Sequence, residues 1–382
     1  MLVWIVIVIT MAVLSYRAYH KIRNPFWSRM PVVHDYGLTR FLARPGYIQE
    51  GEAVPDQWWD PNKVSVFKFE SLSIERRKEF CSFIRDHYLN TEKIAYKPSD
   101  DKLLSLFSST SCYISFLNDV SSGEPGETKT GGVVSSRPLT MFLPDRKLVL
   151  NYCDLLCIRP DLRQMGLSPY LIQTQTYQVR TTSMNACIFK RENDSRMCIT
   201  PLVEFDVLGF DCSELELDLN YEARTNIVAI DKRNFFKVKD LIKQRVRPLF
   251  KCLIVPTIDQ LLSLVTAKIV MIFAFVVDDR ITALYLFRDG SVVTNGKDTI
   301  ELISAVDLGC KDKNEFVLGF LSAYRDLLKQ FPVVSIDCIS HNKDIVGYLL
   351  PKHRPFLQTK SSFYLYNYYY PTFDSDSCFI ID

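Results

Sequence analysis

The sequence lacks low-complexity tracts and carries almost no net charge. Its 46 lysine and arginine residues face 44 aspartate and glutamate residues, which leaves a formal net charge of +2. Because the basic residues are scattered along the chain, we expect no nucleic-acid partner. The chain has 382 residues, 47% of them hydrophobic, so it can bury a large core as one big domain or two of ordinary size.

Metal-binding patterns are also missing. Histidine is scarce, and none lies between His87 and His341. The chain has eleven cysteines, but Cys153 and Cys157 have no second pair at metal-ligand spacing. The odd number and the absence of a compact framework favour reduced thiols in a cytosolic compartment. The sequence therefore predicts no metal site.

One apolar run stands apart, at the N-terminus. Residues 2–14 are nearly all apolar, and Arg17, Lys21 and Arg23 follow them. The run is short for a full span, which needs about 20 residues, but residues 15–19 bring it close. We expect residues 2–16 to anchor the chain in a membrane, with the rest of the chain facing the cytosol because the flanking positive charge lies C-terminal to the run. A cleaved signal peptide and an N-terminal strand are the alternatives.

The same order of elements is predicted twice, as helix, antiparallel strands, helix and strand. The first set comprises helices at 73–89 and 100–107, strands at 133–143 and 147–158, a helix from 168 and a strand at 184–190. The second set comprises a helix at 234–248, strands at 269–277, 281–287 and 299–308, a helix at 314–331, and strands at 333–339 and 362–370. No sequence repeat is visible. The pattern predicts two similar α/β halves that share a mixed sheet and join near residues 211–226.

Two connections carry turn signals. Asp278-Asp279-Arg280 predicts a tight hairpin between two of these strands. Residues 121–132 are rich in Ser, Gly, Glu and Thr, which favours a flexible hairpin tip.

The most informative stretch covers residues 148–180. A strand-like run ends at Ile158, a polar turn follows, and Ser168 and Pro169 open an amphipathic helix. Unpaired N–H groups and the positive end of the helix dipole make such a helix start an anion site. Residues 163–168 (Arg-Gln-Met-Gly-Leu-Ser) have the spacing with which acyl-CoA-dependent N-acyltransferases hold pyrophosphate, although an ordinary strand-to-helix turn has similar residues.

Five segments, in the right order, carry a resemblance to one family. They are Asn-Pro-Phe-Trp-Ser-Arg-Met-Pro-Val at 24–32, Asp-Leu-Leu-Cys-Ile-Arg at 154–159, Leu162-Arg163 with Ser168-Pro169 and Leu171-Ile172, Ser-Ile-Asp-Cys to Asn342 at 335–342, and Phe-Tyr-Leu-Tyr-Asn-Tyr at 363–368. Each resembles a motif of the N-myristoyltransferases, and together they cover nearly the whole chain after the apolar run.

The resemblance implies an α/β fold of two tandem acetyltransferase-like (GNAT) halves on one mixed, twisted sheet. Residues 1–23 would be the hydrophobic anchor with its basic flank. Residues 24–215 would bind acyl-CoA, and residues 216–382 would bind the peptide and supply the C-terminal carboxylate.

The resemblance also implies a reaction. The family moves a myristoyl group from myristoyl-CoA to the α-amine of an N-terminal glycine, so acyl-CoA is a co-substrate, Gly-initiated proteins are partners, and no cofactor is bound permanently. By position, the backbone amides of Leu155 and Leu156 match the oxyanion hole, and the terminal carboxylate of Asp382 matches the base that deprotonates the amine. The apolar residues 378–381 favour a tail threaded into the core over a frayed one.

The remaining site residues are carried over in the same way. The pyrophosphate would be held by Arg163, Gln164, Met165, Gly166, Leu167 and Ser168, and Phe26 and Trp27 would cover the acyl-CoA. Tyr88, Asp337 and Asn342 would contact the peptide.

Several positions depart from the family pattern. Met165 and Gly166 stand where the family has Lys and Arg, Asp154 replaces Asn, and Lys190 replaces an active-site Thr. The family's histidine has no counterpart near Gly209. Two alternatives therefore remain beside an active myristoyltransferase. One is a pseudoenzyme that binds acyl-CoA or Gly-initiated peptides, and the other is an N-acyltransferase with a different acyl length or acceptor.

Overall fold

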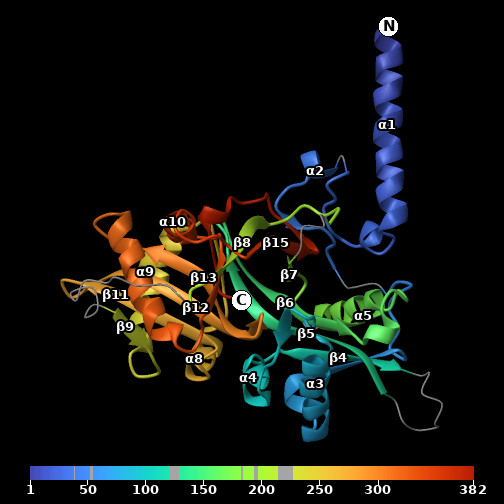
Figure 1. Ribbon diagram of the computed structural model, residues 1–382. Helices are drawn as coiled ribbons and strands as arrows, with labels where there is room; N and C mark the ends of the chain where they lie inside the picture. The colour runs from blue at the N-terminus through green and yellow to red at the C-terminus, as the bar shows by residue number, and fades with distance from the viewer. Residues whose placement is uncertain (38, 52–54, 120–128, 182–183, 193–196, 214–226) are drawn as a thin grey trace.

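The structure is a computed structural model that describes residues 1–37, 39–51, 55–119, 129–181, 184–192, 197–213 and 227–382 (Figure 1). Most of the expected hairpin tip at 121–132 and most of the expected junction at 211–226 lie outside the described residues. The division of the chain into two halves near residue 215 therefore stays a prediction.

A large twisted sheet runs through the described part of the chain (Figure 1). In its N-terminal part the strands are β2 (Val64–Lys68), β3 (Ile94–Tyr96), β4 (Tyr113–Asp119), β5 (Lys129–Phe142), β6 (Lys147–Ile158), β7 (Cys187–Glu192) and β8 (Val203–Asp211). In its C-terminal part they are β9 (Ile227–Ile230), β10 (Cys252–Val255), β11 (Val270–Val277), β12 (Arg280–Thr294), β13 (Lys297–Asp307), β14 (Val333–Asp337), β15 (Leu357–Tyr366) and β17 (Cys378–Ile380). A separate pair joins β1 (Gly46–Tyr47) to β16 (Tyr368–Tyr369).

Helices pack on this sheet and confirm the mixed α/β class. They are α3 (Ile74–His87), α4 (Asp100–Ser105), α5 (Ser168–Arg180), α7 (Phe235–Leu241), α8 (Ile258–Thr266), α9 (Lys313–Leu328) and α10 (Asn342–Leu349). The predicted helix at 234–248 is only partly right, because α7 gives way to a π-helical turn (Ile242–Val246) and a 3₁₀ turn (Arg247–Leu249). Pro248 explains the second change, since proline lacks the N–H that would continue the helix.

One topology occurs twice in the sheet. In the first occurrence β5 and β6 are antiparallel, α5 follows, and β7 lies parallel to β6. In the second β12 and β13 are antiparallel, α9 follows, and β14 lies parallel to β13. The repeat of pattern expected from the sequence is therefore present. The hairpin between β11 and β12 is confirmed as well, with Asp278 and Asp279 at φ of +47° and +58°.

Strands β6 and β7 separate part-way along their length. They pair only from Asn151 with Cys187 to Cys153 with Phe189, although both strands continue beyond that point. Beyond that point the two strands no longer pair with each other: β6 continues along β5 from Asp154, and β7 continues along β15 from Lys190. This split opens the sheet where the sequence predicts chemistry.

The C-terminal tail enters the core, as expected from its apolar residues. Strand β17 pairs in parallel with β10, and the Ile381 amide donates to the Ile254 carbonyl at 2.8 Å. Phe379 and Ile381 are fully buried, and Asp382 is 6% exposed. The tail lies beside β13, where the Ser304 hydroxyl donates to the Ile380 carbonyl at 3.1 Å.

The N-terminal run is a helix, α1 (Leu2–Arg23), which stands away from the body (Figure 1). Residues 3–23 are long and apolar enough to cross a bilayer, and an 18-residue window within them has a mean hydropathy of 1.5. The alternative of an N-terminal strand is wrong. The last turn of α1 contacts the body, where the His20 ring stacks on Tyr36.

Candidate active site

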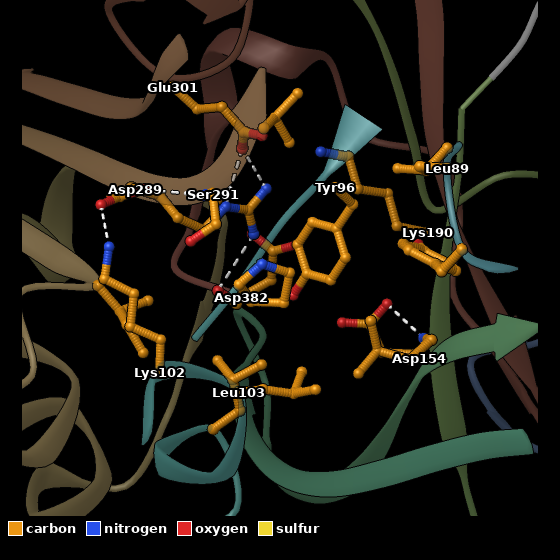
Figure 2. Close-up of a pocket in the computed structure, with 18 of the residues that line it drawn as sticks. Leu89, Tyr96, Lys102, Leu103, Asp154, Lys190, Asp289, Ser291, Glu301 and Asp382 are labelled. Atoms are coloured by element: carbon orange, nitrogen blue, oxygen red, sulfur yellow. Dashed lines mark hydrogen bonds and ion pairs between the residues drawn. The ribbon is translucent and has the colours of Figure 1, made fainter. Parts of the chain in front are cut away.

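Two cavities meet at the split between β6 and β7. The first has a volume of about 390 Å³ and apolar walls that include Trp27, Ile172 and Phe189. The second has a volume of about 330 Å³ and a charged lining (Figure 2). Their shared wall consists of Tyr88, Asp154, Leu155, Lys190 and Arg191. An apolar cavity and a charged cavity therefore adjoin at the point where the two strands stop pairing with each other.

A β-bulge shapes this junction. Val133 pairs with Cys157 and Ser135 with Asp154, so two residues of β6, Leu155 and Leu156, lie opposite one residue of β5. Leu155 has a φ of +53°, which is unusual for a branched-chain residue. Its side chain is buried, whereas Leu156 is 39% exposed. The bulge interrupts the regular ladder at the two residues that the sequence assigns to an oxyanion hole.

The carboxylate of Asp154 already contacts this bulge. Its Oδ1 accepts a hydrogen bond from the Leu155 amide at 2.8 Å. Its Oδ2 lies 3.6 Å from Nη1 of Arg137, a guanidinium whose side chain is 3% exposed. Arg137 also stacks over the Tyr152 ring at 4.8 Å. The Asp154 carboxylate thus occupies the Leu155 N–H group that an oxyanion hole at this position would use.

The turn before α5 presents backbone amides to solvent. Gln164 and Gly166 both have positive φ, +64° and +71°. Leu167 caps the helix without a side-chain hydrogen bond, and the first turn contains no acidic residue. Left-handed residues next to an uncapped helix start are a backbone arrangement that can bind an anion, so anion binding at this turn stays a prediction. Ser168, the first residue of α5, lines the apolar cavity.

The Arg163 guanidinium has a structural role in this turn. Its Nε donates to the Ile158 carbonyl at 2.9 Å, and its Nη2 donates to the His87 carbonyl at 2.9 Å, which ties the turn to the end of α3. Met165 is 64% exposed and makes no charge contribution. Anion binding at the turn therefore depends on backbone amides more than on side-chain charge.

The segment at residues 26–32 packs into the core of the protein. Met30 and Val32 are buried, and the Tyr366 hydroxyl contacts the Met30 sulfur at 3.4 Å. Trp27 stacks on Phe189 at 5.3 Å and lines the apolar cavity. Phe26 lies behind it in the core cluster and lines neither cavity.

A chain of partly and fully buried charges lines the other cavity. Arg288 pairs with Glu301 through Nε at 2.8 Å and with Asp382 Oδ1 at 2.9 Å. The same guanidinium donates to the main-chain oxygen of Asp382 at 3.3 Å, and the Tyr152 hydroxyl donates to Asp382 Oδ2 at 3.0 Å. Figure 2 shows Asp382 and Glu301 within this cluster and Asp154 pointing into the cavity separately from it. The terminal residue is therefore held by several hydrogen bonds.

Lys190 carries a second buried pair into the same region. Its Nζ lies 3.3 Å from Asp337 Oδ2, and its side chain is 8% exposed. Asp337 lies behind Lys190 and lines neither cavity. Asn342 is fully buried and donates to the carbonyls of Leu302 at 3.1 Å and Asp337 at 2.7 Å. Of the three residues predicted to contact peptide, only Tyr88 lines a cavity.

Burial and charge pairing set the pKa values of this cluster in opposite directions. Burial raises the pKa of Asp337 to about 6, because Lys190 offsets only part of the desolvation and Glu301 adds like charge. Burial also acts to raise the pKa of Asp382, but Arg288 and Lys190 outweigh it and hold that pKa well below its usual range. Burial lowers the pKa of Lys190, but Asp337 more than compensates, so the pKa is raised and the ammonium stays charged.

Two tyrosines line the charged cavity beside Asp154. The rings of Tyr88 and Tyr96 lie 5.4 Å apart, edge to face. Burial, followed by the charge of Asp154, raises the pKa of both phenols. Both hydroxyls therefore stay protonated at neutral pH and can donate hydrogen bonds.

We compared the sequence and the structure with those of known proteins. No protein-family model matches the chain, and no curated protein matches it in sequence. Solved structures do match. Saccharomyces cerevisiae N-myristoyltransferase with bound myristoyl-CoA superposes with a TM-score of 0.69 at 12% identity, over 92% of this chain and 94% of that one. The chain has the N-myristoyltransferase fold.

Two further structures of the yeast enzyme agree. One with bound myristoyl-CoA gives a TM-score of 0.71 over 92% of this chain and 89% of that one. Another, with myristoyl-CoA and inhibitors, gives 0.69 over 94% of each chain. Both are 12% identical to this chain, so the likeness is one of fold. The N-myristoyltransferase fold confirms the architecture that the five motif resemblances imply.

The structure brings together some predicted site residues and separates others. Leu155, Leu156, Trp27 and Ser168 surround the apolar cavity, and Asp382 lines the charged one. Their roles stay predictions. In the described part of the chain, no group of three His, Cys, Asp or Glu side chains is placed to hold a metal ion.

Sequence reasoning missed the buried arginines. Arg137 lies within the predicted strand at 133–143, between Ser136 and Pro138, and Arg288 directly follows the apolar run Ala-Leu-Tyr-Leu-Phe in β12. An arginine inside a strand-like apolar run is an unusual core residue and needs a buried partner. That signal was present, although it does not identify the partner.

Proposed function

We propose that the chain transfers a fatty acyl group, myristoyl by preference, from acyl-CoA to the α-amine of an N-terminal glycine. The observation that carries the proposal is the Leu155–Leu156 bulge, which lies where an apolar cavity meets a charged one. The apolar cavity suits the acyl chain, and its volume of about 390 Å³ falls in the range of small-molecule sites. The charged cavity suits a cationic amine.

The cofactor would be held mostly by backbone groups. The N–H groups of residues 163–168 and the start of α5 would bind the pyrophosphate of CoA. Ser168 lines the apolar cavity, so the thioester would enter it from this turn and reach the bulge. Trp27 would cover the acyl chain through its stacking on Phe189.

A membrane location supports this chemistry. Acyl-CoA and acylated product both partition to membranes, so an enzyme anchored by α1 would act where both are concentrated. The basic residues at the end of α1 favour a cytosol-facing body, because positive charge stays on that side of the bilayer.

The test is transfer of radiolabelled myristoyl from myristoyl-CoA to a Gly-initiated peptide. The same peptide with an acetylated N-terminus is the matched control and should accept no label. A panel of acyl-CoA chain lengths then identifies the preferred acyl group, and preference for a chain much shorter than myristoyl would contradict the acyl assignment.

A second function is favoured by one observation. The Asp154 carboxylate occupies the Leu155 amide, which an oxyanion would need. A protein with that contact and no turnover would bind acyl-CoA or Gly-initiated chains without reacting them. Calorimetry with myristoyl-CoA separates the two, since binding without transfer supports the binding protein.

A further inference from the structure

The position of Asp154 sets it apart from the other carboxylates of the site. It lines both cavities, whereas Asp382 and Glu301 line only the charged one. Its Oδ1 contacts the Leu155 amide of the bulge at 2.8 Å. A nucleophile that approaches a thioester carbonyl at this bulge from the charged cavity therefore comes close to Asp154.

One oxygen of Asp154 makes no hydrogen bond to the described residues and has only a longer ion-pair contact. Its Oδ2 lies 3.6 Å from Nη1 of Arg137, which is beyond hydrogen-bond distance. That Nη1 is buried and has no hydrogen-bond partner among the described residues. The side chain of Asp154 is 27% exposed, so a substrate in the cavity can reach it.

Asp382 has less capacity for this task. Its Oδ1 and its main-chain oxygen both contact Arg288, at 2.9 Å and 3.3 Å. Its Oδ2 accepts the Tyr152 hydroxyl at 3.0 Å. The side-chain carboxylate and the terminal carboxylate of Asp382 therefore each contact the Arg288 guanidinium, and a carboxylate that is paired with a cation gives up stabilising contacts when it takes a proton. Its position instead suits holding Arg288 and closing the cavity.

We infer that Asp154, and not the C-terminal residue, accepts the proton from the attacking α-amine. The inference rests on the proposed acyl transfer. The ammonium gives one proton to Asp154 Oδ2, and the neutral amine then attacks the thioester carbonyl carbon. A C–N bond forms, the C–S bond breaks, and a second amine proton goes to sulfur to give the CoA thiol. Asp154 finally releases its proton to water.

The contact with Leu155 gives this step a second effect. While ionised, Asp154 repels the negative charge that develops on the carbonyl oxygen at the bulge. Once protonated it is neutral, and its hydroxyl can donate to that oxygen. The same proton transfer thus activates the nucleophile and removes the charge that obstructs the oxyanion site.

Charged and titratable groups face Asp154 from several elements, and they bear on any pH profile. They are Arg137 on β5, Tyr152 on β6, Lys190, Arg191 and Glu192 on β7, Tyr88 after α3, Tyr96 on β3, Lys102 on α4, Arg288 and Asp289 on β12, Glu301 on β13 and Asp382 at the C-terminus. Tyr88 and Tyr96 stay protonated at neutral pH because burial raises the pKa of each. Lys190 stays charged because its pKa is raised by Asp337 and Glu192 despite burial.

The experiment compares Asp154→Asn with the wild-type chain across pH. Asparagine keeps an oxygen for the Leu155 amide but accepts no proton. We expect kcat/KM at pH 7 to fall about 100-fold, with recovery as the pH rises past about 8, where an α-amine loses its own proton. The Kd for myristoyl-CoA, measured by calorimetry, should change less than threefold. Asp145→Asn, on the β5–β6 turn, is the charge-matched control and should keep wild-type activity.

A semisynthetic chain that ends in an Asp382 α-carboxamide completes the test. We expect its kcat/KM to fall less than tenfold and its pH profile to keep the wild-type shape. Two results would overturn the inference: an Asp154→Asn variant as active as the wild type or more so, or an α-carboxamide chain that alone shows the recovery at high pH. Myristoyl-CoA binding by the wild type without any transfer would overturn the proposed function itself, and the inference with it.

Discussion

Arg288→Met removes the cation that holds the C-terminal residue in the core. Arg288 contacts Glu301 at 2.8 Å and Asp382 at 2.9 Å, and the three side chains are 17%, 19% and 4% exposed. Loss of one partner from a buried ion pair costs about 3–5 kcal/mol, since a charge stays buried without compensation. We expect the free energy of unfolding at pH 7 to fall by that amount. Arg288→Met with Glu301→Met should recover at least about 1 kcal/mol, because one of the stranded charges is then gone.

The pH dependence gives this prediction a sign. The pKa of Asp382 lies well below its usual range, since Arg288 and Lys190 outweigh the effect of burial. A lowered folded-state pKa contributes stability above the unfolded-state pKa of about 3.9, and that stability is lost as the pH falls toward the folded-state value. The Arg288→Met variant lacks most of this contribution. The difference in the free energy of unfolding between the wild type and the variant should therefore be largest at pH 7 and should decrease toward pH 3.

Urea denaturation followed by tryptophan fluorescence measures this difference at each pH, with the m-value as a check that the same surface unfolds. A difference below about 1 kcal/mol at pH 7 would show that the pair is solvated and contributes as a surface pair does. A difference of the same size at pH 7 and pH 3 would refute the assignment of Asp382 as the charge that Arg288 compensates.

Further predictions concern the turn, the second buried pair and the anchor. Gly166→Ala introduces a Cβ at a φ of +71°, which costs about 1 kcal/mol or more; the Kd for myristoyl-CoA by calorimetry should rise about fivefold, and an unchanged Kd would contradict the role of the turn. Lys190→Met should lower the free energy of unfolding by about 3 kcal/mol because it strands Asp337, and adding Asp337→Asn should recover at least half in urea denaturation; no recovery would argue against the pair. Deletion of residues 2–16 should move the protein from the membrane to the soluble fraction with its melting temperature unchanged, and continued sedimentation with membranes would contradict α1 as the anchor.

Local sequence was sufficient for the elements around the site. The apolar run at 147–158, the turn that follows it and the Ser168-Pro169 helix start predict β6 and α5, which the structure places at Lys147–Ile158 and Ser168–Arg180. These signals are strong because each belongs to a short contiguous segment with its own periodicity or turn residues. Helices α8 and α10 and strands β8 and β10 were not predicted. β10 is only four residues long, and so short an apolar run gives little periodicity by which to assign it.

The site itself divides in the same way. The bulge residues Leu155 and Leu156 and the turn at 163–168 lie on one continuous segment, so a motif could indicate them. Asp337 and Asn342 were expected to contact peptide on motif grounds, but neither lines a cavity. A motif conserves spacing along the chain, whereas cavity access depends on which elements cover a residue. The spacing of the motif along the chain therefore could not predict that Asp337 and Asn342 are buried away from the cavities.

The sequence by itself determined the order of elements, the apolar helix at the N-terminus, the apolar tail and the two segments that would carry acyl transfer. Only the tertiary structure decided that Asp154 lies between the two cavities, that Lys190 faces it across the split, and that Arg288 holds Asp382. Asp382 and Arg288 are 94 residues apart in the chain. Hydrophobic periodicity reports which face of an element is buried, but the register of a sheet and the point where two strands separate decide which buried charges meet.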